Sequence, residues 1–328
     1  MNVKCPICEN SNSQVIYKNY PGYLKDSSYE INKCFNCDSH FIVPKEDSHK
    51  IYDIIYSSVN TFGYDRYYRY SKFVKEKKDP LKFLAYSEPS YYPVYQFVKD
   101  KTKLRVLEIG CSYGYLSYAL HKKGFYVKAL DVASKAIKVA RENFGDYFFN
   151  MDLKEFIYQS SERFDLIIAI ELIEHLEKPI EFLSNCKKLL NRNGKIILTT
   201  PNKDYYLTNS IWQTDLPPVH ISWMGKKGIN LLAEKQNFVA TFCDFSNYLP
   251  RNENRLFNYM SSRKEKIGRS SITSEGKPVQ FARPPLFELI YFYVFNRISV
   301  LRFISNLIHN VFNGSENTLG IILEQKRN

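Results

Sequence analysis

Apolar residues in the second half of the chain recur in short runs, and segments of helical periodicity lie between the runs. Five runs predict strands: Leu104–Ile109, Tyr126–Leu130, Tyr147–Met151, Leu166–Ile170 and Lys195–Thr200. The intervening segments predict helices: Tyr115–Lys123, Ser134–Asn143, Asp152–Ser160 and Pro179–Leu190. Strands separated by helices of this length predict an α/β fold with a parallel sheet. Two further runs, Val239–Phe245 and Leu319–Glu324, are expected to close the sheet.

The remaining segments have other patterns. Residues 1–44 hold short β-like pieces around a Pro-Gly turn, and residues 45–103 are rich in Tyr and Lys and are predicted to be mainly helical. Residues 247–313 interrupt the sheet with a basic loop and then an apolar helical part. We therefore divide the chain into residues 1–44, 45–103, 104–246, 247–313 and 314–328, with the last segment as the closing strand.

Four of the seven cysteines form two tight pairs, Cys5–Cys8 and Cys34–Cys37, with 25 residues between the pairs. Each CxxC loop can hold a metal from two sides, and two such loops supply the four thiolates of a structural zinc site. Free buried cysteines or a redox CxxC are the alternatives. The spacing favours a zinc ribbon in a reducing compartment, because an odd cysteine count does not suit a disulfide scaffold.

A glycine-containing turn follows the first strand of the sheet. Gly110 and Gly114 would let the backbone turn sharply and let a ligand approach closely. Asp131 ends the second strand, where a carboxylate can accept both hydroxyls of a ribose, and Asp152 follows the third strand. Together with Glu108, these acids are expected at the carboxyl ends of the strands, where open α/β sheets bind ligands.

These residues resemble the first motifs of the class I S-adenosylmethionine-dependent methyltransferases, and the resemblance covers roughly residues 104–246 and the terminal strand. It implies a Rossmann-like seven-stranded methyltransferase sheet, here with a small N-terminal zinc ribbon and a helical insertion before the last strand. An NAD-binding domain is the competing interpretation, but the turn lacks the GxGxxG spacing. The resemblance implies that S-adenosylmethionine is bound by Glu108, Gly110, Cys111, Gly114, Tyr115, Asp131, Val132, Asp152, Leu153 and Glu171.

Acidic and imidazole side chains follow the fourth strand. If a helical turn begins there, Glu171, Glu174 and His175 share one face at i, i+3 and i+4. His220 lies in a later loop that should overhang the same pocket. Two carboxylates and imidazoles are suitable ligands for Mg²⁺, Mn²⁺ or Zn²⁺. In the alternative without a metal, His175 acts as a base or lines the pocket.

This arrangement resembles two metal-dependent groups, the ubiquinone-pathway O-methyltransferases and the small-RNA 3′-terminal 2′-O-methyltransferases. The resemblance implies that a divalent ion binds the hydroxyls of the acceptor. A bound metal would lower the pKa of the acceptor hydroxyl, with His175, His220 and Glu174 as the catalytic groups.

Composition narrows the range of partners. The chain has 328 residues with 44% hydrophobic residues, so it can bury a core and is not globally disordered. Its net charge of +12 indicates an anionic partner such as a nucleotide, a nucleic acid, a sugar phosphate or a lipid head group. No run reaches the ~20 apolar residues of a membrane-spanning helix, and the N-terminus has no signal-peptide pattern. We therefore expect a cytoplasmic location.

Two aromatic or apolar segments could add to the site. Tyr64 or Tyr67 is a candidate for a lid over the cofactor, whereas most of the neighbouring tyrosines are expected to pack in the core. Part of residues 286–312 has an apolar helical stripe, made up of Val300, Leu301, Ile304, Leu307, Ile308 and Val311. The stripe is expected to pack on the sheet domain or a dimer partner; the alternative is peripheral contact with the inner membrane surface.

A zinc ribbon beside this domain resembles the bacterial sugar and glycan methyltransferases. The resemblances together imply an S-adenosylmethionine-dependent methyltransferase that O-methylates a hydroxyl on a sugar, a surface glycan, or a phenolic or lipid-linked small molecule. A sugar C-methyltransferase and an RNA ribose 2′-O-methyltransferase are the alternatives. RNA is favoured less, and it predicts binding that weakens steeply with salt. A cofactor-binding scaffold without activity is disfavoured because the acidic and histidine positions are all present.

Overall fold

The computed structural model describes residues 3–43, 51, 65–205, 209, 211, 215–250, 269–273, 277, 279, 303–308 and 316–326. Most of the expected insertion at 286–312, and the candidate lid residue Tyr64, lie outside the described residues. Among the described residues, no helix is long and apolar enough to cross a membrane.

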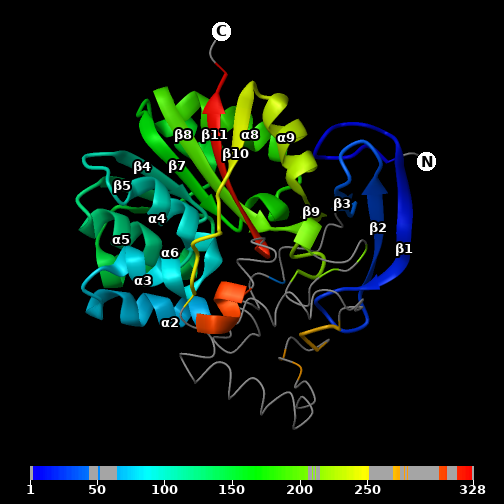
Figure 1. Cartoon of the computed structure of the whole chain (residues 1–328), viewed down its shortest axis with the longest axis horizontal. Coiled ribbons are helices and arrows are strands. Elements are labelled where there is room, and N and C mark those ends of the chain that lie inside the picture. Colours follow the sequence, from blue (N-terminus) through cyan, green and yellow to red (C-terminus); the bar gives the residue numbers. More distant parts are fainter. Residues whose placement is uncertain are drawn as a thin grey trace.

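A seven-stranded sheet forms the centre of the molecule (Figure 1). Its strands, in spatial order, are β10 (Phe238–Phe242), β11 (Thr318–Gln325), β8 (Leu190–Pro201), β7 (Phe164–Ile170), β4 (Arg105–Ile109), β5 (Tyr126–Asp131) and β6 (Phe148–Asn150). The strands from β8 to β6 are parallel, as the sequence predicted, and β11 runs antiparallel between β8 and β10. The parallel part places the ends of β4, β5, β6 and β7 at one edge, so the turns that follow these strands lie there together.

Helices cover both faces of this sheet. The described helices and 3-10 turns are α2 (Asp65–Phe73), η1 (Val74–Glu76), α3 (Pro80–Ser87), η2 (Pro89–Tyr91), α4 (Tyr92–Val98), α5 (Tyr115–Lys122), α6 (Ser134–Phe144), α7 (Leu153–Gln159), η3 (Ile173–His175), α8 (Pro179–Leu189), η4 (Lys203–Tyr205) and α9 (Lys226–Glu234). Neighbouring strand residues alternate between two cores. Leu107 and Ile167 pack in the core formed with α7, α8 and α9, whereas Val106 and Leu166 pack in the core formed with α3, α4 and α5. This two-residue period gives the three-layer α/β architecture.

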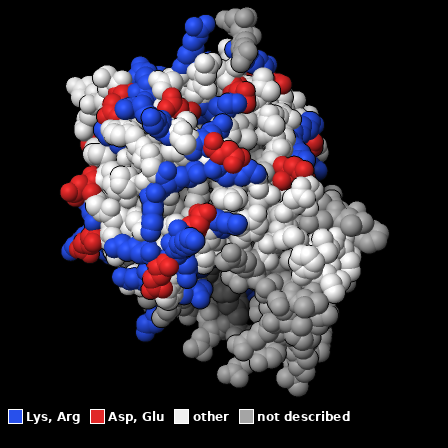
Figure 2. Space-filling model, turned by 60° about the vertical axis from the view of Figure 1, so that its left-hand side comes forward, with Lys and Arg blue, Asp and Glu red and all other residues white. Residues whose placement is uncertain are grey.

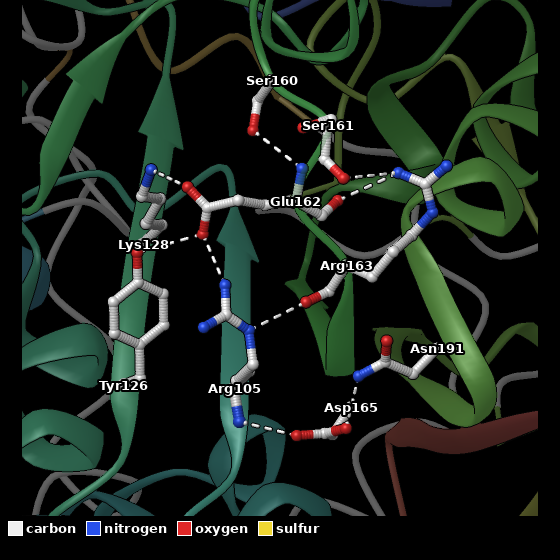
Figure 3. Close-up of polar contacts among 9 residues, drawn as sticks. All are labelled: Arg105, Tyr126, Lys128, Ser160, Ser161, Glu162, Arg163, Asp165 and Asn191. Atoms are coloured by element: carbon white, nitrogen blue, oxygen red, sulfur yellow. Dashed lines mark hydrogen bonds and ion pairs between the residues drawn. The ribbon is translucent and has the colours of Figure 1, made fainter.

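A polar network fixes the edge of the sheet opposite the strand ends that carry the candidate site (Figure 3). The carboxylate of Glu162 accepts hydrogen bonds from Lys128, from Tyr126 Oη at 3.0 Å and from Arg105 Nη2 at 2.6 Å. The backbone N–H of Arg105 donates to Asp165 Oδ2 at 2.9 Å, which links β4 to β7. These contacts join β4, β5 and β7 where the strands begin, and so help to keep the register that aligns their other ends.

A second, smaller sheet is built from two distant parts of the chain. It contains β1 (Ser13–Pro21), β2 (Ser28–Cys34), β3 (His40–Phe41) and β9 (Ser222–Trp223), in that order. We call residues 3–43 the N-terminal module. Part of the predicted basic loop also contacts this module, because Ile272 forms a β-bridge with Leu24.

The apolar stripe of the insertion is oriented differently from our expectation where it is described. Residues 303–308 are helical, and Ile304, Leu307 and Ile308 are 40–45% exposed, whereas Ser305 and Asn306 are buried. The expectation that these apolar residues pack on the sheet domain is therefore wrong for this segment, because its polar side faces inward.

Candidate functional site

The turn after β4 has the conformation that its glycines permit. Gly110 and Gly114 both have φ +76°, a left-handed value that residues with a Cβ rarely adopt, and Gly114 precedes the first residue of α5. A Cβ on Gly114 would lie 2.4 Å from the ring of Phe148. The turn therefore needs glycine here for its backbone and also for the close packing of β6.

Asp131 connects this turn to the end of β5. Its carboxylate accepts hydrogen bonds from the backbone N–H of Ser112 at 2.7 Å and from that of Ala133 at 2.8 Å. Burial raises the pKa of Asp131, although these N–H donors act in the opposite direction. Each carboxylate oxygen has a second lone pair, so Asp131 can hold the turn and still accept a ligand hydroxyl.

Glu108 is turned into the protein under the same turn. Its carboxyl group is buried and hydrogen-bonded to the hydroxyl of Ser117 in α5. Burial raises the pKa of Glu108 to about 8. The role of Glu108 in this structure is therefore to anchor α5 behind the turn; its contact with a cofactor stays a prediction.

The other predicted cofactor residues lie around the same strand ends. Val132 is 72% exposed after β5, whereas Cys111 and Leu153 are buried. Asp152 caps α7, because its carboxylate accepts the backbone N–H of Glu155 at 2.8 Å. Tyr115 begins α5, and its hydroxyl lies 2.5 Å from that of Tyr91.

An acidic and imidazole cluster lies after β7. One ligand atom each from Glu174, His175 and His220 falls within 4.8 Å of the others. The rings of His175 and His220 meet edge to face, with centroids 4.6 Å apart. The later loop therefore brings His220 close to the residues that follow β7, as the sequence predicted.

The backbone around this cluster sets the orientation of His175. Its Nδ1 lies 2.5 Å from the carbonyl of Val219, so Nδ1 carries the proton and Nε2 carries the lone pair. Nε2 is 3.8 Å from Glu174 Oε1. Burial lowers the pKa of both His175 and His220, which keeps both rings neutral at neutral pH.

Glu174 is the residue that most clearly fits a bound cation. The side chain is fully buried, and neither carboxylate oxygen has a hydrogen-bond partner among the residues that the structure describes. Burial, together with the charge of Glu171, raises the pKa of Glu174 well above its ordinary value. A divalent ion bound by Glu174, His175 and His220 would compensate this buried acid, and one carboxylate with two imidazoles is a common donor set for such ions.

The expected helical face with Glu171 is not formed. Glu171 has φ +48° and precedes the 3-10 turn, so no continuous helical turn runs from Glu171 to His175. Its N–H contacts Thr199, and burial raises the pKa of its carboxyl group to about 7. Among the described residues, the group of close ligand atoms therefore holds Glu174, His175 and His220, and Glu171 is near enough to raise the pKa of Glu174. A place for Glu171 among the metal ligands stays a prediction.

Sequence reasoning missed three neighbours of this cluster. Asp215 Oδ1 lies 4.0 Å from His220 Nδ1, and Arg66 in α2 influences the pKa of Glu171 through its charge. Tyr23, from the N-terminal module, is buried, and the charges of Asp215 and Tyr67 add to the effect of burial in raising its pKa. Asp215, five residues before His220, offered a weak local signal; the other two come from distant segments and offered none.

The four cysteines of the N-terminal module form one buried cluster. Cys5 Sγ is 3.6 Å from Cys37 Sγ, and Cys8 Sγ is 3.6 Å from Cys34 Sγ. A tetrahedral zinc with bonds of about 2.3 Å would place its sulfur ligands about 3.8 Å apart, whereas a disulfide needs about 2.05 Å. The geometry therefore fits a zinc ion held by four thiolates.

The two CxxC loops have the same backbone geometry. The N–H of Glu9 donates to the carbonyl of Cys5 at 2.8 Å, and the N–H of Asp38 donates to that of Cys34 at 2.9 Å. Both Glu9 and Asp38 have a positive φ. This repeated turn directs two thiols from each loop towards one point, as a metal site requires.

Comparisons with known proteins match part of the chain to methyltransferases. Residues 79–241 match the family model described as a methyltransferase domain, and the match begins before the boundary at 104 that the sequence pattern indicated. The ubiquinone biosynthesis O-methyltransferase of Coxiella burnetii is 33% identical over 104 residues, which is 30% of this chain and 44% of that protein. The protein of the same name from Glaesserella parasuis is 31% identical over 120 residues, 33% of this chain and 51% of that protein. The chain thus spans about half the length of the curated relatives it matches.

Solved structures with a similar arrangement include a SAM-dependent methyltransferase from Archaeoglobus fulgidus, which has 16% identity and a TM-score of 0.44 and covers 72% of this chain and 93% of its own. The plantazolicin methyltransferase BpumL in complex with SAH has 16% identity and a TM-score of 0.43, and covers 85% of this chain and 98% of its own.

Proposed function

Residues 79–241 match the family model of a methyltransferase domain, and from this match we propose that the chain is an S-adenosylmethionine-dependent O-methyltransferase. The observation that carries the proposal is the position of the Glu174–His175–His220 cluster. It follows β7, at the same edge of the sheet as the Gly110–Gly114 turn that follows β4. A methyl donor on the turn and a hydroxyl at the cluster would then be neighbours.

On the donor side, the chain would bind and orient S-adenosylmethionine. The backbone of the Gly110–Gly114 turn admits the cofactor closely, and Asp131 would accept the ribose hydroxyls at the end of β5. Methyl transfer from a sulfonium is an in-line displacement, so holding donor and acceptor in line supplies a large part of the rate.

On the acceptor side, the hydroxyl has to lose a proton as its oxygen takes the methyl group. Without a bound ion, the neutral rings of His175 and His220 can accept this proton, and the Val219 carbonyl fixes the tautomer of His175. With an ion bound, the lone pairs of these rings would hold the ion instead of accepting the proton. We propose that Glu174, His175 and His220 also hold a divalent ion, with Mg²⁺ or Mn²⁺ as the first candidates. When bound, such an ion would lower the pKa of the acceptor hydroxyl.

For the acceptor, we propose a hydroxyl on a sugar, a glycan, or a phenolic or lipid-linked small molecule. On the face shown in Figure 2, Lys and Arg lie among Asp and Glu. A sugar C-methyltransferase is the alternative within small molecules. The exposed residues Phe303, Ile304, Leu307 and Ile308 support peripheral membrane contact, as a lipid-linked acceptor would need.

The test is a methyl-transfer assay with labelled S-adenosylmethionine and a panel of phenols, nucleotide sugars, glycans and RNA, with EDTA or with added Mg²⁺ or Mn²⁺. We expect metal-stimulated transfer to oxygen of a sugar or phenol. Transfer to carbon would overturn O-methylation, and transfer to RNA alone would favour the RNA enzyme. If S-adenosylhomocysteine does not bind, the proposed function is wrong.

A further inference from the structure

The N-terminal module is joined to the segment that carries His220. We call residues 215–223 the His220 loop. Its last two residues are β9, which pairs with β3 through His40–Trp223 and Phe41–Ser222 (Figure 1). The sheet of the cysteine-bearing module therefore continues directly into the loop of the candidate site.

A chain of backbone hydrogen bonds continues from this pairing to the acidic residue of the cluster. The N–H of Ile42 donates to the carbonyl of Ile221 at 3.0 Å, and the N–H of Ile221 donates to the carbonyl of Glu174 at 3.0 Å. One residue of the His220 loop, Ile221, thus lies between the module and η3. A displacement of β3 would be passed to both His220 and Glu174.

The other end of the His220 loop is held by the same module. The N–H of Tyr23 donates to the carbonyl of Pro217 at 2.7 Å. Tyr23, Val219 and Trp223 belong to one buried apolar cluster, which also includes Ile42 and Ile221. The loop is therefore fixed at both ends and along its buried side.

Helix α9 holds the module in this position. Lys227 pairs with Asp38 and Lys235 with Glu9, each at 2.9 Å, so one charged partner comes from each cysteine loop. Gly228 lets the helix approach closely, because a Cβ there would lie 2.3 Å from Ser39 Oγ. By contrast, the Gly110–Gly114 turn is supported by β5 and β6, through Asp131 and Phe148.

We propose that the N-terminal module is a positioning element for the acceptor side of the site, and that loss of its metal releases the His220 loop while the Gly110–Gly114 turn stays in place. The four thiols would hold zinc, which would in turn fix the end of β2 at Cys34 and the turn before β3 at Cys37. Ile42, Ile221 and Tyr23 act as positioning residues, because they reach the cluster only through the loop. This inference rests on the proposed function for the role of His220.

The test compares zinc content and hydrogen exchange in the full chain and in two cysteine variants. Cys34→Ser removes one thiol of the cluster, and Cys243→Ser makes the same chemical change outside it. We expect Cys34→Ser to lose zinc and its peptides covering 215–224 to exchange about 10-fold faster, because local opening follows the loss of supporting contacts. Peptides covering 106–131 should exchange as in the wild type, and Cys243→Ser should change neither region.

A second variant tests whether the effect of Cys34→Ser arises only from general unfolding of the module. Ile42→Pro keeps all four thiols but removes the N–H that donates to Ile221. It should retain zinc, bind S-adenosylhomocysteine as the wild type does, and still show faster exchange at 215–224 and weaker binding of Mn²⁺ alone. The proposal is overturned if exchange at 215–224 is unchanged in both Cys34→Ser and Ile42→Pro, or if 106–131 exchanges faster to the same extent. Exchange is read without substrate, so failure of methyl transfer in the wild type would overturn only the proposed function.

Discussion

The two sides of the site are built in different ways. The donor side comes from one continuous segment, in which β4, the Gly110–Gly114 turn, α5 and β5 follow one another and Asp131 closes back onto the turn. The acceptor side is assembled from η3, the His220 loop and the N-terminal module, which are far apart in the sequence. The comparison suggests that one side can be disabled without the other.

Glu174→Gln should have the largest effect, because it should disable the acceptor side and leave the donor side intact. This change removes the buried charge that a divalent ion needs and keeps the shape of the side chain. We expect methyl transfer to fall about 1,000-fold, as for loss of a group that assists proton transfer. S-adenosylhomocysteine binding, measured by calorimetry, should be unchanged. The control is Glu177→Gln, an exposed acid three residues later. Equal methyl-transfer activity of the two variants would show that Glu174 has no role in the reaction.

Asp131→Ala should do the reverse: it should weaken the donor side and leave the acceptor side intact. The variant loses the acceptor for ribose hydroxyls and for the N–H groups of Ser112 and Ala133. We expect S-adenosylhomocysteine to bind about 100-fold more weakly, since hydrogen bonds to a charged group are worth ~1.5–3 kcal/mol. Binding of Mn²⁺ to the Glu174 cluster, followed by electron paramagnetic resonance, should not change. A variant that binds the cofactor normally would disprove the proposed ribose contact.

A pair of glycine variants sharpens the account of the donor side. Gly114→Ala combines φ +76° with a Cβ 2.4 Å from Phe148, whereas Gly124→Ala has φ +93° but open space around its Cβ. Both should lower the free energy of unfolding, and Gly114→Ala should cost about 2 kcal/mol more because overpacking adds to backbone strain. Urea unfolding measures the difference. Equal losses would mean that the contact with β6 does not constrain the turn.

The last prediction concerns pH. Burial raises the pKa of Glu108 to about 8 from an ordinary value of 4.5. The folded state therefore keeps a proton that the unfolded state has lost, and stability falls as pH rises from about 4.5 to about 8. Glu108→Gln cannot ionise, so its melting temperature should fall less over this range. Parallel melting curves for the variant and the wild type would contradict the buried, protonated Glu108.

The donor side was largely readable from the sequence. The strand, the glycines of the turn and Asp131 lie close together along the chain. Glycine indicates a tight backbone turn, and an aspartate at a strand end indicates a carboxylate that can bind a ligand. The structure moves most boundaries of the predicted elements by only one or two residues, in either direction. It also adds that Asp131 and Glu108 hold the turn and α5 from within, which depends on side-chain contacts that no local pattern reveals.

The acceptor side was readable only in part. The spacing identified Glu174, His175 and His220, but the helical-face argument failed because Glu171 adopts a left-handed conformation before the 3-10 turn. The pairing of β3 with β9 joins residues about 180 positions apart and has no local signal. For the same reason, the inward polar side of residues 303–308 could not be foreseen, since periodicity predicts a two-sided helix but not which side is covered.

The most direct test of the central claim is calorimetric titration of the wild-type chain with S-adenosylhomocysteine, once in EDTA and once with added Mn²⁺. If the donor side is self-contained, one molecule binds per chain in the low-micromolar range under both conditions, and the two dissociation constants agree within about twofold because the sites are weakly coupled. Absence of binding, or binding that requires Mn²⁺, would contradict a donor site that stands apart from the acceptor side.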